Sequence, residues 1–369
     1  LQAVARAIIT DFRGTLDEQV SRRVPGTIQA EYLPIARQHN LVVNSAGDLP
    51  QVDLILSNPL GGFSEDGSEY IITTTPTQRT PLPWVNVLAN AQFGSVISES
   101  GLAYTWSENA HEYRLTPWSD DSVGAASGEA FYLRDEQSGQ YWSPTPLPSR
   151  GVNPYLTRHG FGYSVFEHSE FGIQSTLCVY VDIKETVKFT VLTVRNLSAY
   201  PRRISATGYV EWVLGDLRAK SAAHIVTEID ANSGALFARN SYNSGFVGRV
   251  AFFDVDDLSR TLTADRTEFL GRNGSLAQPA AMSRSRLSGR VGASLDPCGA
   301  IQVGFELQPG QSREIIFRLG AGQDLGHTRE LAQRLRAVGT ARSALDKVKL
   351  YWQQALGVIQ VQTPDPALN

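Results

Sequence analysis

The chain has 369 residues, a formal net charge of −4 and an apolar content of 42%, enough to bury one large hydrophobic core or two smaller ones. Charged residues make up 19% of the chain, too few and too balanced to attract nucleic acid phosphates or an anionic membrane surface. The composition therefore predicts no nucleic acid partner and no direct membrane contact, and it favours a neutral ligand.

The two cysteines, Cys178 and Cys298, cannot form a disulfide framework, and their spacing matches no zinc site. Cys178 lies in a strand pattern and is interpreted as a small buried hydrophobe, whereas Cys298, beside Pro297, is interpreted as a loop thiol without an adjacent base. No apolar run approaches the roughly 18 residues of a membrane span, and the N-terminus lacks a signal-peptide pattern. The sequence predicts no metal site and no nucleophilic cysteine.

Residues 1–12 predict a helix, because their apolar side chains recur at helical spacing, at Leu1, Val4, Ala5, Ile8 and Ile9. Residues 13–48 mix polar side chains with two prolines and indicate no regular element. We expect the chain to be part of a longer protein. Leu1 is not an initiator residue, and the C-terminal run Pro364-Asp365-Pro366 is a helix-start signal with no helix after it.

The central part of the chain alternates apolar and polar residues, as half-buried antiparallel strands do. The clearest pattern covers residues 173–183, where one face carries Ile173, Leu177, Val179, Val181 and Ile183. Similar runs cover residues 186–194, 204–214, 235–239, 246–253, 301–307 and 314–319. Many strands with turn residues between them predict a sandwich or barrel. After residue 320 the period becomes helical and predicts two closing helices, which end before Gly339 and Gly357.

Residues 56–163 differ from the strand region, because aromatic and polar side chains interleave there without clean periodicity and glycine is frequent. We predict binding loops in this region, where most of the six tryptophans lie. A sugar ring presents an apolar face of C–H groups and a rim of hydroxyls, so its binder needs flat aromatic rings beside hydrogen-bonding groups. The alternative is that the tryptophans fill the core and their polar neighbours cap turns. Both interpretations remain open at this point.

Several runs in this region form a long and specific pattern. They are Asn58-Pro59-Leu60-Gly61-Gly62-Phe63-Ser64, Phe93-Gly94-Ser95-Val96-Ile97-Ser98-Glu99-Ser100-Gly101, Tyr104-Thr105-Trp106, Arg114-Leu115-Thr116-Pro117-Trp118, Gly128-Glu129-Ala130-Phe131-Tyr132-Leu133-Arg134-Asp135 and Arg158-His159-Gly160-Phe161-Gly162-Tyr163. The stretch resembles the N-terminal region of glycoside hydrolase family 94, formerly called glycosyltransferase family 36, and specifically the phosphorylase-like part of bacterial cyclic β-1,2-glucan synthases. The resemblance continues to Asn369.

The resemblance implies a mostly β fold, a large antiparallel β-sandwich of the supersandwich, galactose-mutarotase-like type, with short helices at the N-terminus and a C-terminal helical linker. It divides the chain into an N-terminal helix and irregular lead-in (1–48), a β-sandwich carbohydrate-handling domain (49–320), and a helical linker (321–369) leading to an (α/α)6 catalytic barrel. In the family the catalytic acid and the phosphate-binding groups lie in that barrel. The resemblance therefore assigns this chain no catalytic residue, no metal and no cofactor, and inorganic phosphate would bind in the barrel.

The implied function is that of a non-catalytic domain that binds or shapes the glucan pocket of a cyclic β-1,2-glucan synthase or a related inverting β-glucan or disaccharide phosphorylase. The chain alone is expected to be inactive, while its parent is expected to be a glycosyltransferase or phosphorylase acting on β-1,2-glucan. The implied partners are a β-glucan oligosaccharide, the catalytic barrel and a second copy in a homodimer. The resemblance places the domain in the cytoplasm and its parent protein in the bacterial inner membrane.

The candidate substrate-binding residues come from the family-like runs and are Gly61, Gly62, Phe63, Trp84, Trp106, Arg114, Trp118, Arg158 and His159. The glycines would let the backbone approach a ligand closely, the aromatic residues would offer stacking faces, and the arginines would donate several hydrogen bonds to hydroxyls or orient a carboxylate.

Two other functions stay open: a free-standing carbohydrate-binding protein and, less favoured, a complete small glycosidase. A glycosidase needs two carboxylates across the scissile bond, and the aromatic region supplies Glu65, Asp66, Glu99, Glu108, Glu112, Asp120 and Asp121. The run Asp254-Val255-Asp256-Asp257 is similar to the acidic metal motif of nucleotide-sugar transferases. Without a nucleotide-binding α/β unit around it, this run is interpreted as a strand-end turn.

Overall fold

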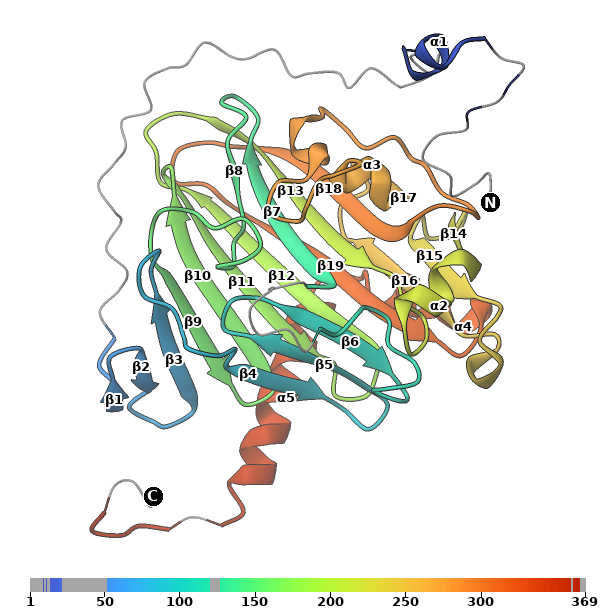
Figure 1. Ribbon diagram of the computed structural model, residues 1–369. Coiled ribbons are helices and arrows are strands. Elements are labelled where there is room, and N and C mark those ends of the chain that lie inside the picture. Colours follow the sequence, from blue (N-terminus) through green and yellow to red (C-terminus); the bar gives the residue numbers. More distant parts are fainter. Residues whose placement is uncertain are drawn as a thin grey trace.

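A computed structural model describes residues 9, 11, 14–21, 52–119, 127–359 and 361–365. In these ranges the strands form three antiparallel sheets of eleven, five and three strands, and helices are short or confined to the C-terminal part (Figure 1). The mostly β sandwich expected from the sequence is confirmed. The helix expected over residues 1–12 lies outside the described residues except for two positions, and the first described helix is α1 (Leu16–Ser21).

The large sheet has the strand order β1-β2-β3-β9-β10-β11-β12-β19-β16-β15-β14. Its strands are β1 (Ile55–Asn58), β2 (Gly61–Phe63), β3 (Glu69–Thr74), β9 (Tyr155–Gly160), β10 (Tyr163–Glu170), β11 (Ile173–Val181), β12 (Val187–Asn196), β14 (Ile225–Ile229), β15 (Leu236–Asn240), β16 (Val250–Val255) and β19 (Ser312–Gly322).

The five-stranded sheet has the order β17-β18-β13-β7-β8, and the three-stranded sheet has the order β4-β5-β6. Their strands are β4 (Val85–Ala89), β5 (Phe93–Ser98), β6 (Ala103–Ser107), β7 (Glu129–Asp135), β8 (Tyr141–Trp142), β13 (Arg202–Glu211), β17 (Arg260–Asp265) and β18 (Pro297–Leu307). The remaining helices are α2 (Arg218–Ser221), α3 (Arg266–Leu270), α4 (Leu325–Arg334) and α5 (Thr340–Leu356).

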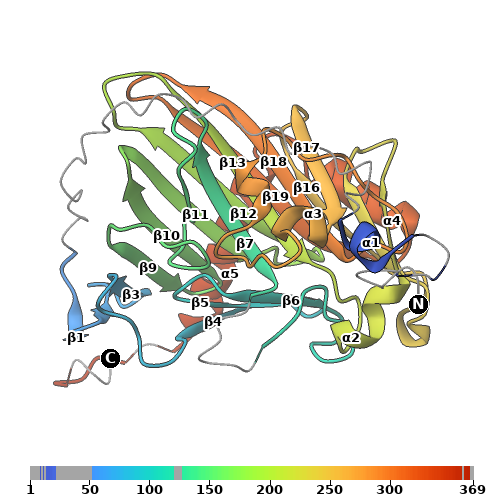
Figure 2. The ribbon, with the colours of Figure 1, turned by 45° about the horizontal axis from the view of Figure 1, so that its top comes forward.

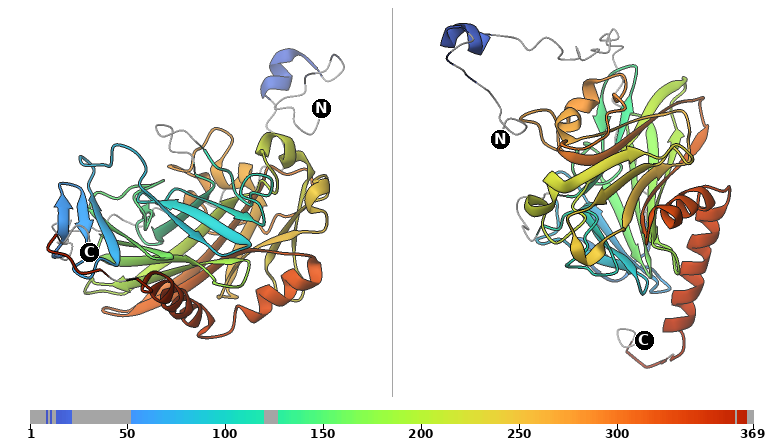
Figure 3. Two further views of the ribbon diagram at one scale, coloured as in Figure 1. Left: turned by 90° about the horizontal axis from the view of Figure 1, so that it is seen from below. Right: turned by 90° about the vertical axis from the view of Figure 1, so that its right-hand side faces the viewer.

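The large sheet is the middle layer of the molecule. The five-stranded and three-stranded sheets lie on one of its faces (Figure 2), and α4 and α5 lie on the other (Figure 3). The main apolar core fills the space between the sheets and includes Phe166, Trp212 and Phe317. A second core joins the large sheet to the helices and includes Phe189, Leu331 and Val348.

The clearest alternating runs of the sequence form the central strands of these sheets. Residues 173–183 contain β11, residues 186–194 lie largely in β12 and residues 204–214 in β13. The shorter runs correspond to β15, β16, β18 and β19. The apolar side chains of β11 at Ile173, Leu177 and Val179 face the main core, as the alternation predicts.

The two closing helices form where the helical period predicts them. Gly339 separates α4 from α5 in a left-handed backbone conformation, with φ +80°, which a residue with a β-carbon adopts only with strain. The buried face of α5 carries Ala341, Ala344 and Val348, small side chains that let the helix lie close to the sheet. The helix ends at Gly357, as expected.

Two expectations about local structure are wrong. Residues 56–163 are not a continuous loop region, because they also contain the strands β1 to β9. In β6, one face carries aromatic residues and the other carries small or polar buried residues such as Thr105 and Ser107. The strand therefore lacks the alternation of apolar and polar residues from which a strand is predicted. Cys298 is not a loop thiol, because it lies within β18 and is fully buried.

Candidate functional site

The structure separates the predicted site residues into two groups at opposite ends of the three-stranded sheet. The carbonyl of Trp84 accepts a hydrogen bond from the backbone of Glu99 at one end of this sheet. Trp106 pairs with Gly94 in the register of β5 and β6, toward the other end. The first group is Gly61, Gly62, Phe63, Trp84, Arg158 and His159, and the second is Trp106, Arg114 and Trp118.

Within the first group, three aromatic rings form a chain at the edge of the large sheet. Phe63 and Tyr70 meet edge to face with ring centroids 4.9 Å apart, and Tyr70 meets Trp84 at 5.8 Å. Such geometry is favourable for aromatic pairs. Phe63 is exposed and the other two rings are partly buried, so part of this chain faces solvent.

Gly61 and Gly62 are explained by strand packing. A β-carbon on Gly61 would lie 2.0 Å from the carbonyl oxygen of Ile71 on β3, and one on Gly62 would lie 2.9 Å from the Cα of Ser57 on the other side. No side chain fits at such distances without moving a backbone. The close approach that these glycines allow is therefore an approach to β3 and β1.

Arg158 and His159 are engaged by neighbouring groups of the fold. The guanidinium of Arg158 pairs with Glu167 at 2.5 Å and lies 3.7 Å from Glu69. The imidazole of His159 contacts Ser164 Oγ at 2.8 Å and the carbonyl of Trp84 at 3.2 Å. Burial lowers the pKa of His159 to about 4. His159 is therefore neutral at pH 7 and joins three segments.

The run that contains these two residues forms the β9–β10 hairpin, which is shaped to receive α5. A β-carbon on Gly160 would lie 2.4 Å from the ring of Tyr163, and one on Gly162 would lie 2.4 Å from the indole of Trp352. Asn86 of β4 secures the hairpin, because its amide donates to the carbonyls of Gly160 and Tyr163, each at 2.9 Å. Asn86 lies in the aromatic and polar region of the sequence, but its neighbours there did not predict this structural role.

The second group forms an aromatic surface on the outer face of β6. Tyr104 lies 5.3 Å from Trp106 and 4.7 Å from Trp118, measured between ring centroids. We call Tyr104, Trp106 and Trp118 the outer aromatic surface. Trp118 is 39% exposed, whereas the core tryptophans Trp142 and Trp212 are 1% and 0% exposed. The core interpretation of the tryptophans thus holds for these two and fails for Trp118.

Gly94 lets Trp106 lie against β5. A β-carbon on this glycine would be 2.2 Å from the indole ring of Trp106, so the ring occupies the space of a side chain. Arg114 lies beside this surface in an isolated bridge to Trp106. Its guanidinium donates to the carbonyls of Ala110 at 3.2 Å and Asp216 at 3.4 Å, so it pairs with backbone rather than with a carboxylate.

Beneath the outer aromatic surface lies a buried polar cluster that the sequence analysis missed. It consists of Ser95, Thr105, Thr116, Glu129 and Lys188, which we call the junction cluster. The ammonium of Lys188 is paired with Glu129 and donates to Thr105 Oγ1 at 2.6 Å. Burial lowers the pKa of Lys188, while Glu129 opposes that change. Polar residues in strands usually face solvent. The sequence pattern of these five residues therefore did not predict that they are buried.

Three of the carboxylates considered for a glycosidase are engaged by neighbouring groups of the fold. Glu99 is buried and accepts from Thr80 Oγ1 and the backbone of Trp84, and burial raises its pKa. Glu108 is paired with Arg249 at 2.5 Å. Asp66 accepts from Ser64 and Ser68 within its own turn, and Asp120 and Asp121 lie outside the described residues.

No metal site is found in the part of the chain that the structure describes. The same part of the chain contains no helix with the length and hydrophobicity of a membrane span. The run at Asp254 is partly a strand rather than a turn, since Asp254 lies in β16 and is fully buried.

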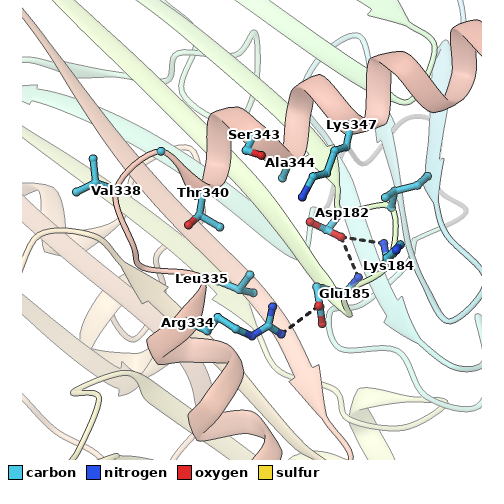
Figure 4. Close-up of a pocket in the computed structure, with 12 residues that line it drawn as sticks. Asp182, Lys184, Glu185, Arg334, Leu335, Val338, Thr340, Ser343, Ala344 and Lys347 are labelled. Carbon is cyan, nitrogen blue, oxygen red and sulfur yellow. Dashed lines mark hydrogen bonds and ion pairs between the residues drawn. The ribbon is translucent and has the colours of Figure 1, made fainter.

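A pocket lies where the turn between β11 and β12 meets the junction of α4 and α5 (Figure 4). Arg334 pairs with Glu185 across it at 3.0 Å, and Asp182 accepts hydrogen bonds from the backbone of Lys184 and Glu185. None of the predicted site residues lines this pocket. Its charged groups join the helices to the sheet.

Comparison with known families accounts for the sandwich and for the specific runs of the sequence together. Residues 68–338 match the profile of the family described as glycosyl hydrolase 94, supersandwich domain. The chain belongs to this family. The resemblance seen in the sequence is thereby confirmed, and the described architecture is that of the family's supersandwich domain.

Three curated relatives show the range of proteins that carry this domain. The cyclic β-(1,2)-glucan synthase NdvB of Rhizobium meliloti is 34% identical over 380 residues, covering 100% of this chain and 13% of the relative. The N,N'-diacetylchitobiose phosphorylase of Vibrio furnissii is 29% identical, covering 84% and 39%. The solabiose phosphorylase of Paenibacillus borealis is 25% identical, covering 84% and 41%. The chain thus spans less than half the length of each of these proteins, and it is a carbohydrate-related domain of the kind they contain.

Proposed function

We propose that this chain is a non-catalytic domain that binds glucan, or shapes its pocket, within a cyclic β-1,2-glucan synthase or a related inverting β-glucan or disaccharide phosphorylase. Catalysis and phosphate binding would belong to a separate (α/α)6 barrel of the same protein, with which this domain would pack, in a homodimer as its relatives are expected to form. The domain would work in the cytoplasm, in a parent protein held at the bacterial inner membrane.

The observation that carries this proposal is the outer aromatic surface. Tyr104, Trp106 and Trp118 bring three rings together, with centroids 4.7 and 5.3 Å from that of Tyr104, and Trp118 is 39% exposed. Such rings are suited to the C–H faces of neighbouring glucose units. The chain's low net charge agrees with a neutral ligand.

The aromatic chain at Phe63, Tyr70 and Trp84 is the second candidate contact. It also has one exposed ring, since Phe63 is 39% exposed, as Trp118 is, but Tyr70 of this chain is held by a hydrogen bond from Asn58. Its neighbours Arg158 and His159 are already paired within the fold. We therefore assign the principal sugar contact to the outer aromatic surface and a supporting role to the first group.

Isothermal titration calorimetry of the full-length enzyme and of the isolated chain with β-1,2-linked glucooligosaccharides tests this assignment, and the variants are compared in the full-length enzyme. We expect Trp118→Ala to raise the dissociation constant about ten-fold or more, because stacking by one aromatic ring contributes on the order of 1 kcal/mol beyond its buried area. Trp84→Ala is the matched control at the other end of the sheet and should change binding less. Equal affinity of wild type and Trp118→Ala would reject the outer aromatic surface.

The same titrations separate the proposal from its alternative, a free-standing carbohydrate-binding protein. If the isolated chain binds the oligosaccharide as tightly as the full-length enzyme does, the barrel adds nothing to the affinity. That result would favour a free-standing carbohydrate-binding protein. If binding requires the full-length enzyme and is still weakened by Trp118→Ala there, the surface is one wall of a shared pocket. The second result is the one that we expect.

A further inference from the structure

The junction cluster is the place where the three sheets meet. Glu129 begins β7 of the five-stranded sheet, Lys188 lies on β12 of the large sheet, and Ser95 and Thr105 lie on β5 and β6 of the three-stranded sheet. All are nearly fully buried, with 0 to 4% of their surface exposed. One ion pair with its hydroxyl partners therefore connects every sheet of the described chain.

Thr105 is the central hydroxyl of this cluster. Its Oγ1 lies 2.5 Å from Glu129 Oε1, 2.6 Å from Lys188 Nζ and 3.2 Å from Ser95 Oγ. Its backbone N–H donates to Thr116 Oγ1 at 2.8 Å, and that hydroxyl donates to Glu129 Oε1 at 2.9 Å. The cluster thus holds β6 and the segment at Thr116 to the same carboxylate.

The two segments held in this way are those that carry the outer aromatic surface. Tyr104 and Trp106 flank Thr105 on β6, and their side chains lie on the opposite face of the strand because side chains alternate. Thr116 lies two residues before Trp118. The ring centroid of Tyr104 lies 4.7 Å from that of Trp118 and 5.3 Å from that of Trp106. A shift of either segment along the sheet would change these distances.

A buried ion pair is a poor device for stability alone, because apolar side chains of similar volume often serve as well or better. Its directional bonds, in contrast, select one arrangement of the strands, since a shifted strand would leave buried charges and hydroxyls unpaired. We propose that the junction cluster positions the outer aromatic surface for glucan, with Thr105 as the positioning residue. This inference rests on the proposed function.

Thr105→Val tests the inference, because it removes the hydroxyl and keeps the shape of the side chain. The matched control is Thr263→Val on β17, where Thr263 Oγ1 donates to the buried Glu268 at 2.6 Å. The two changes remove the same kind of bond at different places. Thr105→Ser keeps the hydroxyl and serves as the conservative variant.

We expect Thr105→Val to raise the dissociation constant for β-1,2-linked glucooligosaccharides about five-fold or more, measured by calorimetry on the full-length enzyme. The near-ultraviolet circular dichroism of the aromatic residues should change in the same variant, which reports the ring arrangement. Thr263→Val should leave both quantities at the wild-type value, and Thr105→Ser should restore them. Equal effects of Thr105→Val and Thr263→Val on either quantity would overturn the inference.

The measurements also separate this inference from the proposed function. If Trp106→Ala and Trp118→Ala weaken binding while Thr105→Val does not, the surface binds glucan and the positioning role is wrong. If no tryptophan variant changes binding, the proposed function fails at this surface. In that case a change of the circular dichroism in Thr105→Val alone would still support the positioning of the rings. Should Thr105→Val fold poorly, Ser95→Ala, which removes a peripheral hydroxyl, is expected to have the same effects at smaller size.

Discussion

The indole of Trp352 on α5 occupies the space that a β-carbon on Gly162 would take, since that atom would lie only 2.4 Å from the ring. Gly162 also has φ +81°, a conformation that favours glycine. The β9–β10 hairpin is thus a seat for α5, and the amide of Asn86, which donates to the carbonyl of Tyr163, secures the hairpin itself. Trp352 is thus one of the residues through which α5 packs against the sandwich, together with Ala341, Ala344 and Val348.

Gly162→Ala is therefore expected to destabilise the chain more than its backbone conformation alone requires. Gly139 is the matched control, because it has φ +74° and a β-carbon placed on it would have no atom within 4 Å from any residue beyond its two chain neighbours. Gly139→Ala should cost about 1 to 2 kcal/mol of unfolding free energy, and Gly162→Ala about 1 to 3 kcal/mol more, because it adds a steric clash. Urea denaturation measures both. Equal losses of unfolding free energy in the two variants would show that the Trp352 side chain moves away from the new methyl group without cost.

The sequence was sufficient for the parts of the fold in which one face of each strand is apolar. The strands β11 and β12 and the two closing helices follow from periodicity, because burial there requires apolar side chains at a fixed spacing. The strand β6 does not, since its buried face presents Thr105 to a carboxylate and its outer face carries Trp106. Polar burial reverses the pattern on which such predictions depend.

The sequence predicted which types of residue the candidate site contains, but not where each residue lies in the fold. The family-like runs contain Trp118, which is exposed as a ligand contact should be, and they also contain Gly61, whose neighbour is a carbonyl of β3. Such a run does not say whether a glycine faces a ligand or a strand. The pairing of Lys188 with Glu129 joins residues 59 positions apart, and no local signal announces it.

Trp118→Ala should leave the unfolding free energy within about 1 kcal/mol of the wild type, because an exposed side chain loses little on truncation. Trp212→Ala, which empties a fully buried position, should cost about 3 to 5 kcal/mol. Thermal and urea denaturation of the two variants make the comparison. If Trp118→Ala lowered the unfolding free energy as much as Trp212→Ala does, the Trp118 ring would belong to the core. Its assignment as a sugar contact would then lose its support.

The buried imidazole of His159 predicts a loss of stability in acid. Its pKa is lowered by burial to about 4, against about 6.5 in an unfolded chain. Well above pH 6.5 both states are neutral and the residue contributes no pH dependence. As the pH falls from 6.5 to 4, only the unfolded state binds the proton, so the unfolding free energy decreases by up to about 2 to 3 kcal/mol.

The difference between wild type and His159→Gln isolates this effect from other titrating groups. Urea denaturation at several pH values between about 7.5 and 4.5, a window that spans most of the change, should show the wild type losing more stability than the variant. Parallel curves over this range would mean that His159 takes up its proton in the folded state despite its burial.

The isolated chain is expected neither to hydrolyse nor to phosphorolyse β-1,2-glucan. Two carboxylates of the aromatic region are engaged in the fold, Glu99 by Thr80 and Trp84 and Glu108 by Arg249. Inverting hydrolysis requires an acid and a base on opposite sides of the bond. Release of reducing sugar or of sugar phosphate above the buffer background, abolished by Glu99→Gln or Glu108→Gln, would make the chain an enzyme.

The carboxylate of Asp254 on β16 is the shared partner of three arginines. It lies 2.9 Å from Arg260, 2.7 Å from Arg318 and 2.7 Å from Arg336, and it is fully buried. These arginines come from β17, β19 and the segment after α4, so one charge joins two sheets to the end of a helix. Removing it would leave three guanidiniums close together without their common partner.

Asp254→Asn should therefore cost about 3 to 5 kcal/mol of unfolding free energy, the usual penalty for breaking a buried ion pair on one side. The control is Asp257→Asn, three residues along the chain, whose partner Arg313 is 40% exposed and whose loss should cost about 1 kcal/mol or less. Adding salt should reduce the loss of unfolding free energy in Asp257→Asn and leave the loss in Asp254→Asn unchanged, because salt screens exposed ion pairs. Equal and salt-sensitive losses in the two variants would mean that water reaches Asp254 and that the three arginines do not depend on it.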